Sequence, residues 1–239
     1  MPESAGGKAL AIWASGREGN TACAAADLLA GWQEAGGTAR LLDLRRYGVR
    51  PVGDCRECQG NGACFIRDGF PVLMTEVYAA DLLVLATPLY WYGPSGQMKV
   101  FLDRWSCLLD LEGEEFRARL REKRVALLVA QGEQGFYEAL PCLTMLEWFC
   151  RYLDMAVATR IVVVGHARAD YRDDAAQRRR VQEAGRLLAT SPAVSDVTPP
   201  WFHVPHVPGR PMGGIFSPDR SRPPRRSARG RGDARERRE

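Results

Sequence analysis

The chain has 239 residues, of which 46% are apolar and 26% are charged, the ordinary balance of a globular protein. This composition excludes a wholly disordered or fibrous chain, and no run approaches the roughly 18 consecutive apolar residues of a membrane-spanning helix. The formal charge of +4 comes from the C-terminal residues. Residues 217–239 hold nine arginines and four acidic residues, whereas the rest of the chain holds 24 basic and 25 acidic groups. The body is therefore nearly neutral.

Cysteine content and the first residues bear on the cellular compartment. The seven cysteines are an odd number in a chain long enough to build its own core. Residues 1–7 lack the charged-then-apolar pattern of a secretory signal. Reduced thiols or a metal site are then more consistent with the sequence than a disulfide framework. We expect a cytoplasmic protein that does not associate with a membrane.

Apolar runs alternate with segments of helical period over residues 8–189. The runs predict strands at 8–14, 38–44, 81–86, 124–130 and 158–164, and the periodic segments predict helices at 20–35, 70–80, 95–109, 137–153 and 173–189. Short strands that are apolar on both faces need helices on both faces, which is typical of a parallel sheet with crossover helices. The pattern predicts a doubly wound α/β fold. Any ligand would then bind at the carboxyl ends of the strands.

The chain divides into two parts by composition. Residues 1–190 carry the alternating pattern and are expected to form one domain, whereas 191–239 are rich in proline and arginine and lose apolar periodicity. Such a segment cannot bury enough surface to offset its ordering entropy, so we expect a largely disordered basic tail. Nine arginines fit contact with nucleic-acid phosphates, but a purely solvating tail has the same composition and is commoner. We therefore do not expect nucleic-acid binding.

The loop after the first predicted strand has the composition of a phosphate-binding loop. Residues 14–21 read Ala-Ser-Gly-Arg-Glu-Gly-Asn-Thr and end at a predicted helix N-terminus, where unpaired backbone N–H groups and the helix dipole favour an anion. Ser15, Arg17, Asn20 and Thr21 supply further donors. The alternative is that Asn20 or Thr21 only caps the helix. The glycine fingerprints of dinucleotide sites and of NTPase loops are both absent.

The loop after the third predicted strand is aromatic. It reads Thr-Pro-Leu-Tyr-Trp-Tyr-Gly-Pro-Ser-Gly-Gln over residues 87–97, and three adjacent aromatic residues cannot all be buried in a short turn. Planar side chains on a rigid backbone suit a flat heteroaromatic ring. The alternative is an aromatic corner that packs on the next helix. A phosphate loop at the same sheet edge favours a flavin.

These two loops and the helix Gln-Met-Lys-Val-Phe-Leu-Asp-Arg at 97–104 resemble the flavodoxin-like NAD(P)H-dependent FMN reductases, a family related to iron–sulfur flavoproteins. The resemblance covers residues 8–188 and implies a five-stranded parallel sheet in the order 2-1-3-4-5. It places the FMN phosphate at Ser15, Arg17, Asn20 and Thr21. It places the isoalloxazine against the third-strand loop, with a further loop at its far edge; the implied contacts are Pro88, Leu89, Tyr90, Trp91, Gly93, Gln131 and Gly132. One departure is Gly16, where the family often has proline.

A cysteine motif lies between the second strand and the following helix, at Cys55, Cys58 and Cys64. The resemblance to iron–sulfur flavoproteins raises a [4Fe–4S] cluster, but such a cluster normally needs four ligands and one is missing here, where Asn61 stands. We expect no bound metal; whether these thiols are redox-active stays open. The three histidines offer no metal site.

The resemblance implies an FMN-dependent oxidoreductase that takes electrons from NADPH or NADH and passes them to a small molecule. The acceptor class would be a quinone, a flavin, or a nitro or azo compound. No protein acid or base is obligatory, so no catalytic residue beyond the cofactor-binding ones is assigned. The alternative is a flavodoxin-like electron carrier without its own NAD(P)H site. The family commonly forms homodimers, and we expect the helix at 137–152 and Leu108–Leu109 in such an interface.

Overall fold

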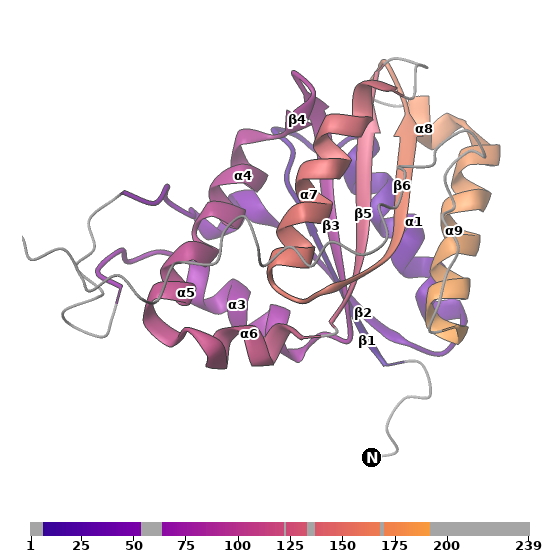
Figure 1. The fold of residues 1–239 in the computed structure, drawn as a ribbon. Helices are drawn as coiled ribbons and strands as arrows, with labels where there is room; N and C mark the ends of the chain where they lie inside the picture. The colour runs from indigo at the N-terminus through magenta and orange to yellow at the C-terminus, as the bar shows by residue number, and fades with distance from the viewer. Residues whose placement is uncertain (1–6, 54–63, 122, 133–136, 168–169, 192–239) are drawn as a thin grey trace, which may run out of the picture. The chain divides into compact units, whose positions relative to one another are not determined.

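A computed structural model describes residues 7–53, 64–121, 123–132, 137–167 and 170–191 (Figure 1). Apart from Ser191, the expected tail lies outside them. Within the described residues, no helix is long and apolar enough to cross a membrane. The elements in chain order are β1 (Lys8–Trp13), α1 (Asn20–Glu34), β2 (Thr38–Asp43), the 3-10 helix η1 (Leu44–Tyr47), α3 (Phe70–Ala79), β3 (Leu82–Tyr90), β4 (Gly93–Pro94), α4 (Gly96–Asp103), α5 (Trp105–Glu112), α6 (Glu114–Leu120), β5 (Arg124–Gln131), the 3-10 helix η2 (Tyr137–Ala139), α7 (Leu140–Tyr152), β6 (Ala156–Val164), α8 (Asp170–Asp173) and α9 (Ala175–Thr190).

The five long strands form one parallel sheet in the order β2-β1-β3-β5-β6. Counted without the two-residue β4, this is the predicted order 2-1-3-4-5, so the predicted flavodoxin-like sheet is confirmed. The sequence did not predict β4, which pairs antiparallel with the end of β3. Because β3 runs parallel to its neighbours, β4 lies at the carboxyl end of the sheet (Figure 1).

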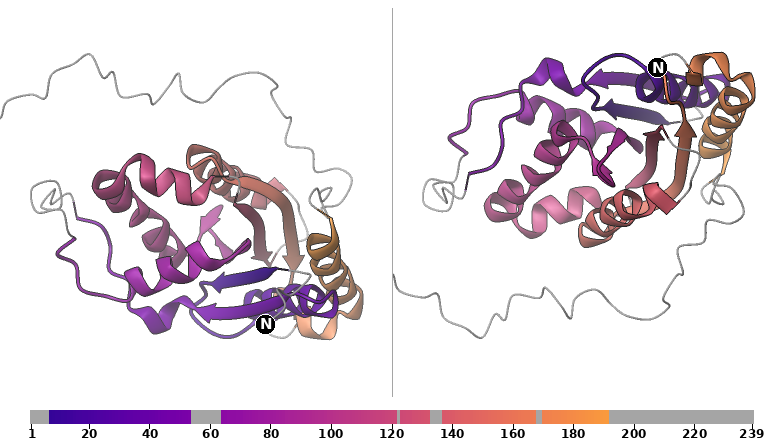
Figure 2. Two further views of the ribbon diagram at one scale, coloured as in Figure 1. Left: turned by 90° about the horizontal axis from the view of Figure 1, so that it is seen from below. Right: turned by 90° about the horizontal axis from the view of Figure 1, so that it is seen from above.

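Successive residues of the central strands face opposite sides of the sheet and enter two separate cores. In β3, Leu83 and Leu85 pack with α3, α4, α5, α6 and α7, whereas Leu82 and Val84 pack with α1, α8 and α9. The views along the strands show these two helical layers with the sheet between them (Figure 2). The prediction of helices on both faces is therefore confirmed.

Two glycines allow α1 and α9 to pack closely. A Cβ atom on Gly185 would lie 2.0 Å from the Leu28 carbonyl oxygen, and one on Gly31 would lie 1.8 Å from the Gln182 carbonyl oxygen. The buried Asp27 carboxylate joins the same helices, since it accepts hydrogen bonds from Arg178 and Gln182. The packing of α1 against α9 thus depends on close contact between the two helix backbones as well as on apolar burial.

The predicted helix at 95–109 is wrong in one respect, because the structure divides it into α4 and α5 at Arg104. The Ser106 hydroxyl donates to the Asp103 carbonyl at 2.7 Å. In a continuous α-helix the Cys107 N–H would donate to that same carbonyl, but it donates to the Arg104 carbonyl at 3.1 Å. This i+3 bond interrupts the α-helical pattern. Helix α6 was not predicted, and β3 extends four residues beyond its predicted end at Ala86.

A buried ion pair connects the break between α4 and α5 to the start of α3. Arg104, 1% exposed, donates to Asp68 Oδ2 at 2.5 Å, and Asp68 Oδ1 accepts from the Phe70 N–H, the first of α3. Burial alone would raise the pKa of Asp68, but the N–H groups of Arg50 and Phe70 and the Arg104 guanidinium hold that pKa below its ordinary value. The pair therefore stabilises the fold at neutral pH.

Candidate active site

The β1–α1 loop forms the first part of the site. β1 ends at Trp13, and the extended Gly19 precedes α1 without a side-chain cap. Gly16, Arg17 and Glu18 are exposed in the loop. The first-turn N–H groups of α1 therefore lack a capping side chain and carry the positive end of the helix dipole. This arrangement suits an anion such as a phosphate.

Three of the predicted phosphate ligands have side chains available at this loop. Within the described part of the chain, Ser15, Arg17 and Thr21 have no side-chain hydrogen bond or ion pair. Ser15 and Thr21 are nearly buried, whereas Arg17 is exposed. Two hydroxyls and one guanidinium thus lie at or beside the uncapped helix terminus.

The fourth predicted ligand, Asn20, is used differently. Its amide nitrogen donates to the carbonyl oxygens of Gly165 and Ala167, both at 2.9 Å, and its oxygen accepts from the Tyr171 N–H at 3.3 Å. Gly165 leaves room for this contact, because a Cβ atom there would lie 2.3 Å from the Asn20 amide nitrogen. The side chain therefore ties the loop to the end of β6. Only its backbone N–H remains for a phosphate.

Arg45 supports the β1–α1 loop, a role that the sequence analysis did not predict. Its guanidinium donates to the Gly16 carbonyl at 3.0 Å, pairs with Asp43 at 2.7 Å, and lies 4.8 Å from the centre of the Trp13 ring. Burial alone would raise the pKa of Asp43, but the hydrogen bonds and charge of Arg45 keep that pKa below its ordinary value. Parallel pairing of β1 and β2 sets Asp43 opposite Trp13 at the strand ends. The sequence could therefore have indicated that Arg45, two residues after Asp43, lies near the β1–α1 loop.

The aromatic loop is a β-hairpin with a strained turn. Leu89 pairs with Pro94 and Tyr90 with Gly93, which leaves Trp91 and Tyr92 as the two turn residues. Both have positive φ, 49° and 63°, as a type I′ turn requires, although Asn-Gly is the usual sequence there. Bulky residues in this region carry strain of about 1–3 kcal/mol each. The structure therefore holds this turn against local preference.

The aromatic side chains of this hairpin point into solvent. Tyr90 is 53% exposed, Trp91 is 95% exposed and Tyr92 is 57% exposed. The alternative of an aromatic corner packed on the next helix is therefore wrong. Of the other predicted ring contacts in the hairpin, Pro88 is buried and Leu89 is half-buried. A flat ligand at this hairpin would contact both the apolar end of β3 and the exposed aromatic turn.

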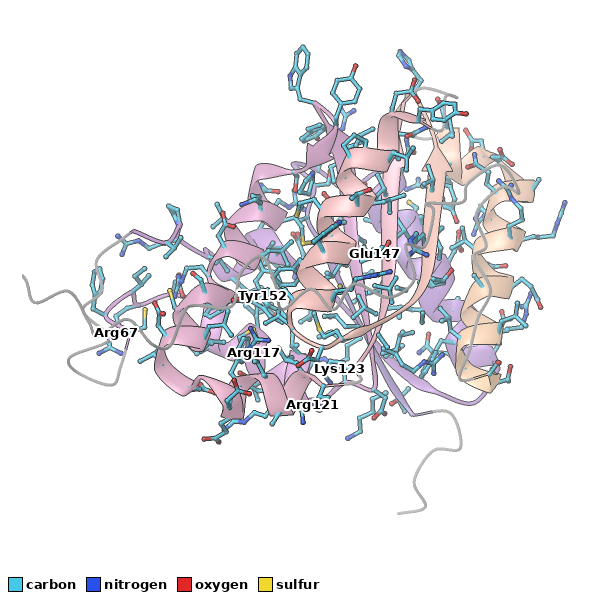
Figure 3. The ribbon with its side chains drawn as sticks, in the orientation of Figure 1. Arg67, Arg117, Arg121, Lys123, Glu147 and Tyr152 are labelled. Atoms are coloured by element: carbon cyan, nitrogen blue, oxygen red, sulfur yellow. The ribbon has the colours of Figure 1, made fainter. Side chains whose placement is uncertain are left out.

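The third predicted loop follows β5. Gln131 is buried at the strand end, its carbonyl accepts from the Gly165 N–H at 2.8 Å, and Gly132 is exposed. Because β1, β3 and β5 are neighbours in the sheet, their following loops meet at one edge. The basic residues Arg117, Arg121 and Lys123 lie at the opposite end of the sheet (Figure 3). The predicted residues thus gather at one edge.

Only part of the cysteine motif lies within the described residues. Cys55 and Cys58 fall outside them, so their role stays a prediction. Cys64 is half-buried, and its sulfur lies 3.8 Å from an Arg104 nitrogen. Among the described residues, no group of three histidine, cysteine or acidic side chains is placed to hold a metal.

Comparison with known proteins identifies the class. The profile of the family described as NADPH-dependent FMN reductase matches residues 8–169. The chain is 28% identical over 169 residues to YwqN of Bacillus subtilis, covering 70% of this chain and 91% of the relative, whose name describes an NAD(P)H-dependent FMN-containing oxidoreductase. It is 31% identical over 87 residues to the iron–sulfur flavoprotein MJ1083 of Methanocaldococcus jannaschii, covering 36% of this chain and 45% of the relative.

A solved structure supports the same class at the level of the fold. NAD(P)H:quinone oxidoreductase from Methanothermobacter marburgensis superposes with a TM-score of 0.60 at 18% identity, covering 76% of this chain and 96% of that structure. This superposition shows a flavodoxin-like fold. The chain belongs to the NADPH-dependent FMN reductase family, with FMN as cofactor and NAD(P)H as electron donor.

Proposed function

We propose that this enzyme binds FMN at the carboxyl edge of β1, β3 and β5 and passes electrons from NAD(P)H to a small conjugated acceptor. One observation carries the proposal. The α1 N-terminus, which no side chain caps, and a strained aromatic hairpin with exposed rings follow adjacent strands. The first suits a phosphate and the second a flat ring, and FMN contains both groups.

The side chains divide between the two ends of FMN. Ser15, Arg17 and Thr21 would donate to the phosphate together with the first N–H groups of α1, including that of Asn20. The isoalloxazine would lie against the hairpin, with the loop after β5 at its far edge; these contacts are Pro88, Leu89, Tyr90, Trp91, Gly93, Gln131 and Gly132. FMN supplies the electron-transfer chemistry, and this chain supplies binding and orientation.

The exposed aromatic turn bears on the acceptor class. Quinones, flavins, nitroaromatics and azo compounds are flat and conjugated, and the segment Tyr90–Pro94 contains no charged side chain that would disfavour an uncharged ring. We therefore keep all four classes as candidate acceptors. The family match favours this enzyme over an electron carrier that lacks an NAD(P)H site.

The proposal includes a homodimer built on α7 and α5. Trp148 and Tyr152 of α7 are exposed aromatic residues. Tyr152 also lines a groove of about 290 Å³, together with Leu109 and Phe149 among others. Apolar surface of this kind is typical of the core of a subunit interface. Sedimentation equilibrium of the wild type and of a Trp148→Asp variant tests it, because the variant is expected to be monomeric.

We also propose a cytoplasmic location. The five cysteines of the described part are free, as is usual in a reducing compartment. Cell fractionation with a tagged protein tests this expectation.

Anaerobic mixing with NADPH tests the proposed reaction. FMN-loaded protein should lose the visible absorbance of its flavin after NADPH is added and regain it when a quinone, an azo dye, a nitroaromatic or free flavin is supplied. The acceptor that restores the absorbance fastest identifies the preferred class. A flavin that NADPH leaves oxidised, but that a reductase partner reduces, would establish the electron carrier instead.

A further inference from the structure

Ser95 connects the two halves of the proposed site through one hydroxyl group. It lies between β4 and α4 and is 2% exposed. Its hydroxyl donates to the carbonyl oxygen of Ala14 at 2.7 Å and accepts from the Met98 N–H at 3.2 Å. Ala14 is the first residue of the phosphate loop, and Ser95 directly follows the aromatic hairpin. The bond thus joins two loops that are 81 residues apart in the chain.

The bond to Ala14 takes the place of a missing sheet hydrogen bond. The Ala14 N–H donates to the Ala86 carbonyl at 3.0 Å. In a parallel ladder, the Ala14 carbonyl would then accept from the residue two positions beyond Ala86. That residue is Pro88, which has no N–H. The Ser95 hydroxyl supplies the donor that the ladder lacks.

Other bonds make this junction rigid on the hairpin side. The Ser95 N–H donates to the Thr87 hydroxyl at 2.9 Å, and that hydroxyl donates to the Pro88 carbonyl at 3.0 Å. Thr87 is fully buried. These bonds connect the two ends of the hairpin to each other, and the Ser95–Ala14 hydrogen bond links them to the end of β1.

A helix cap alone does not require this arrangement. Capping α4 needs only an oxygen that accepts from the Met98 N–H. Donation to Ala14 is a second function of the same hydroxyl, and it acts across the sheet rather than along the helix.

We propose that Ser95 is a positioning residue that fixes the distance between the phosphate loop and the aromatic hairpin. The inference rests on the proposed FMN site. A ligand that engages two subsites at once gains affinity only while their spacing matches the ligand. Ser95 therefore matters for FMN, which spans both loops, and not for a ligand that meets the hairpin alone.

Titration with FMN and with lumiflavin, which has the ring system but no phosphate chain, tests this inference. We compare wild type, Ser95→Ala and Ser95→Thr at a temperature where circular dichroism shows each to be folded. Ser106→Ala is the matched control, because the exposed Ser106 hydroxyl also donates to a backbone carbonyl, at 2.7 Å. Ser95→Gly is the second loss variant, since glycine preserves most of the capping preference.

The Kd for FMN should rise about tenfold in Ser95→Ala and Ser95→Gly, the loss expected for one hydrogen bond. The Kd for lumiflavin should change less than twofold. Ser95→Thr should restore FMN binding, and Ser106→Ala should match the wild type. The visible spectrum of bound FMN should shift only in the two loss variants.

Two results would overturn the inference while leaving the FMN site intact. Equal weakening of FMN and lumiflavin would mean that Ser95 only shapes the hairpin. Unchanged affinity for both ligands, with a lower free energy of unfolding, would mean that it only caps α4. If the wild type bound FMN no better than lumiflavin, the proposed phosphate site itself would fail, and the Ser95 inference would fail with it.

Discussion

Replacing Trp91 with asparagine is expected to stabilise the protein and to weaken its affinity for flavin. Trp91 has φ of 49° at the first position of the type I′ turn, where asparagine is a preferred residue. Its side chain is 95% exposed, so the substitution removes almost no buried apolar area. Relief of the backbone strain therefore decides the sign of the change in stability.

The expected magnitude follows from these two facts. A side chain in the left-handed region costs roughly 1–2 kcal/mol, and asparagine recovers part of it, so the free energy of unfolding should rise by about 1 kcal/mol. In a domain of this size, that corresponds to a Tm about 2–4 °C higher. Loss of one aromatic contact of about 0.5–1.5 kcal/mol should weaken the binding of riboflavin and FMN alike by about 2- to 12-fold.

Urea unfolding of the apoprotein and flavin titration measure the two effects separately. Trp91→Phe is the matched control, because it keeps both an aromatic ring and the strained backbone and should change neither quantity much. A less stable Trp91→Asn protein would refute the argument from strain. A more stable protein with unchanged flavin affinity would show that Trp91 does not contact the ring.

Three further predictions concern the phosphate loop, the helix packing and the acid range. Arg17→Ala should weaken FMN about 10- to 100-fold and barely change riboflavin affinity, whereas Tyr90→Ala should weaken both, as flavin titrations would show. Gly185→Ala should lower the free energy of unfolding by at least about 2 kcal/mol, because its Cβ would meet the Leu28 carbonyl at 2.0 Å, while Gly96→Ala, with open space around it, should not. The lowered pKa of Asp68 means that its contribution is complete at neutral pH and is lost as pH falls below about 4, so Asp68→Asn should be less stable at pH 7 and show a shallower acid slope in urea unfolding.

The sequence predicted the sheet well because its strands carry a strong local signal. Strands such as β5 are buried on both faces, and their apolar runs end at clear turn residues. The break at Arg104 could not be predicted in this way. At the break, Asp103 accepts from the Ser106 hydroxyl, and Arg104 pairs with the buried Asp68, which lies 36 residues earlier in the chain.

The candidate site was predictable in its loops but not in its contacts. The sequence identified the residues that follow β1 and β3, since ligand sites in this architecture lie at the strand ends. It did not show that Asn20 binds the end of β6, that Arg45 holds the Gly16 carbonyl, or that Ser95 replaces a missing ladder donor. Each of these contacts joins segments that only the folded sheet brings together.

A crystal structure of the protein with FMN would show whether the cofactor binds at the carboxyl ends of β1, β3 and β5. We expect the phosphate within hydrogen-bond distance of the first N–H groups of α1 and of Arg17, with the isoalloxazine against Tyr90. FMN seated elsewhere, for example in the cavity of about 500 Å³ lined by Cys64 and Arg104, would contradict it. So would FMN at the sheet edge in the reversed orientation, with its ring at the α1 N-terminus.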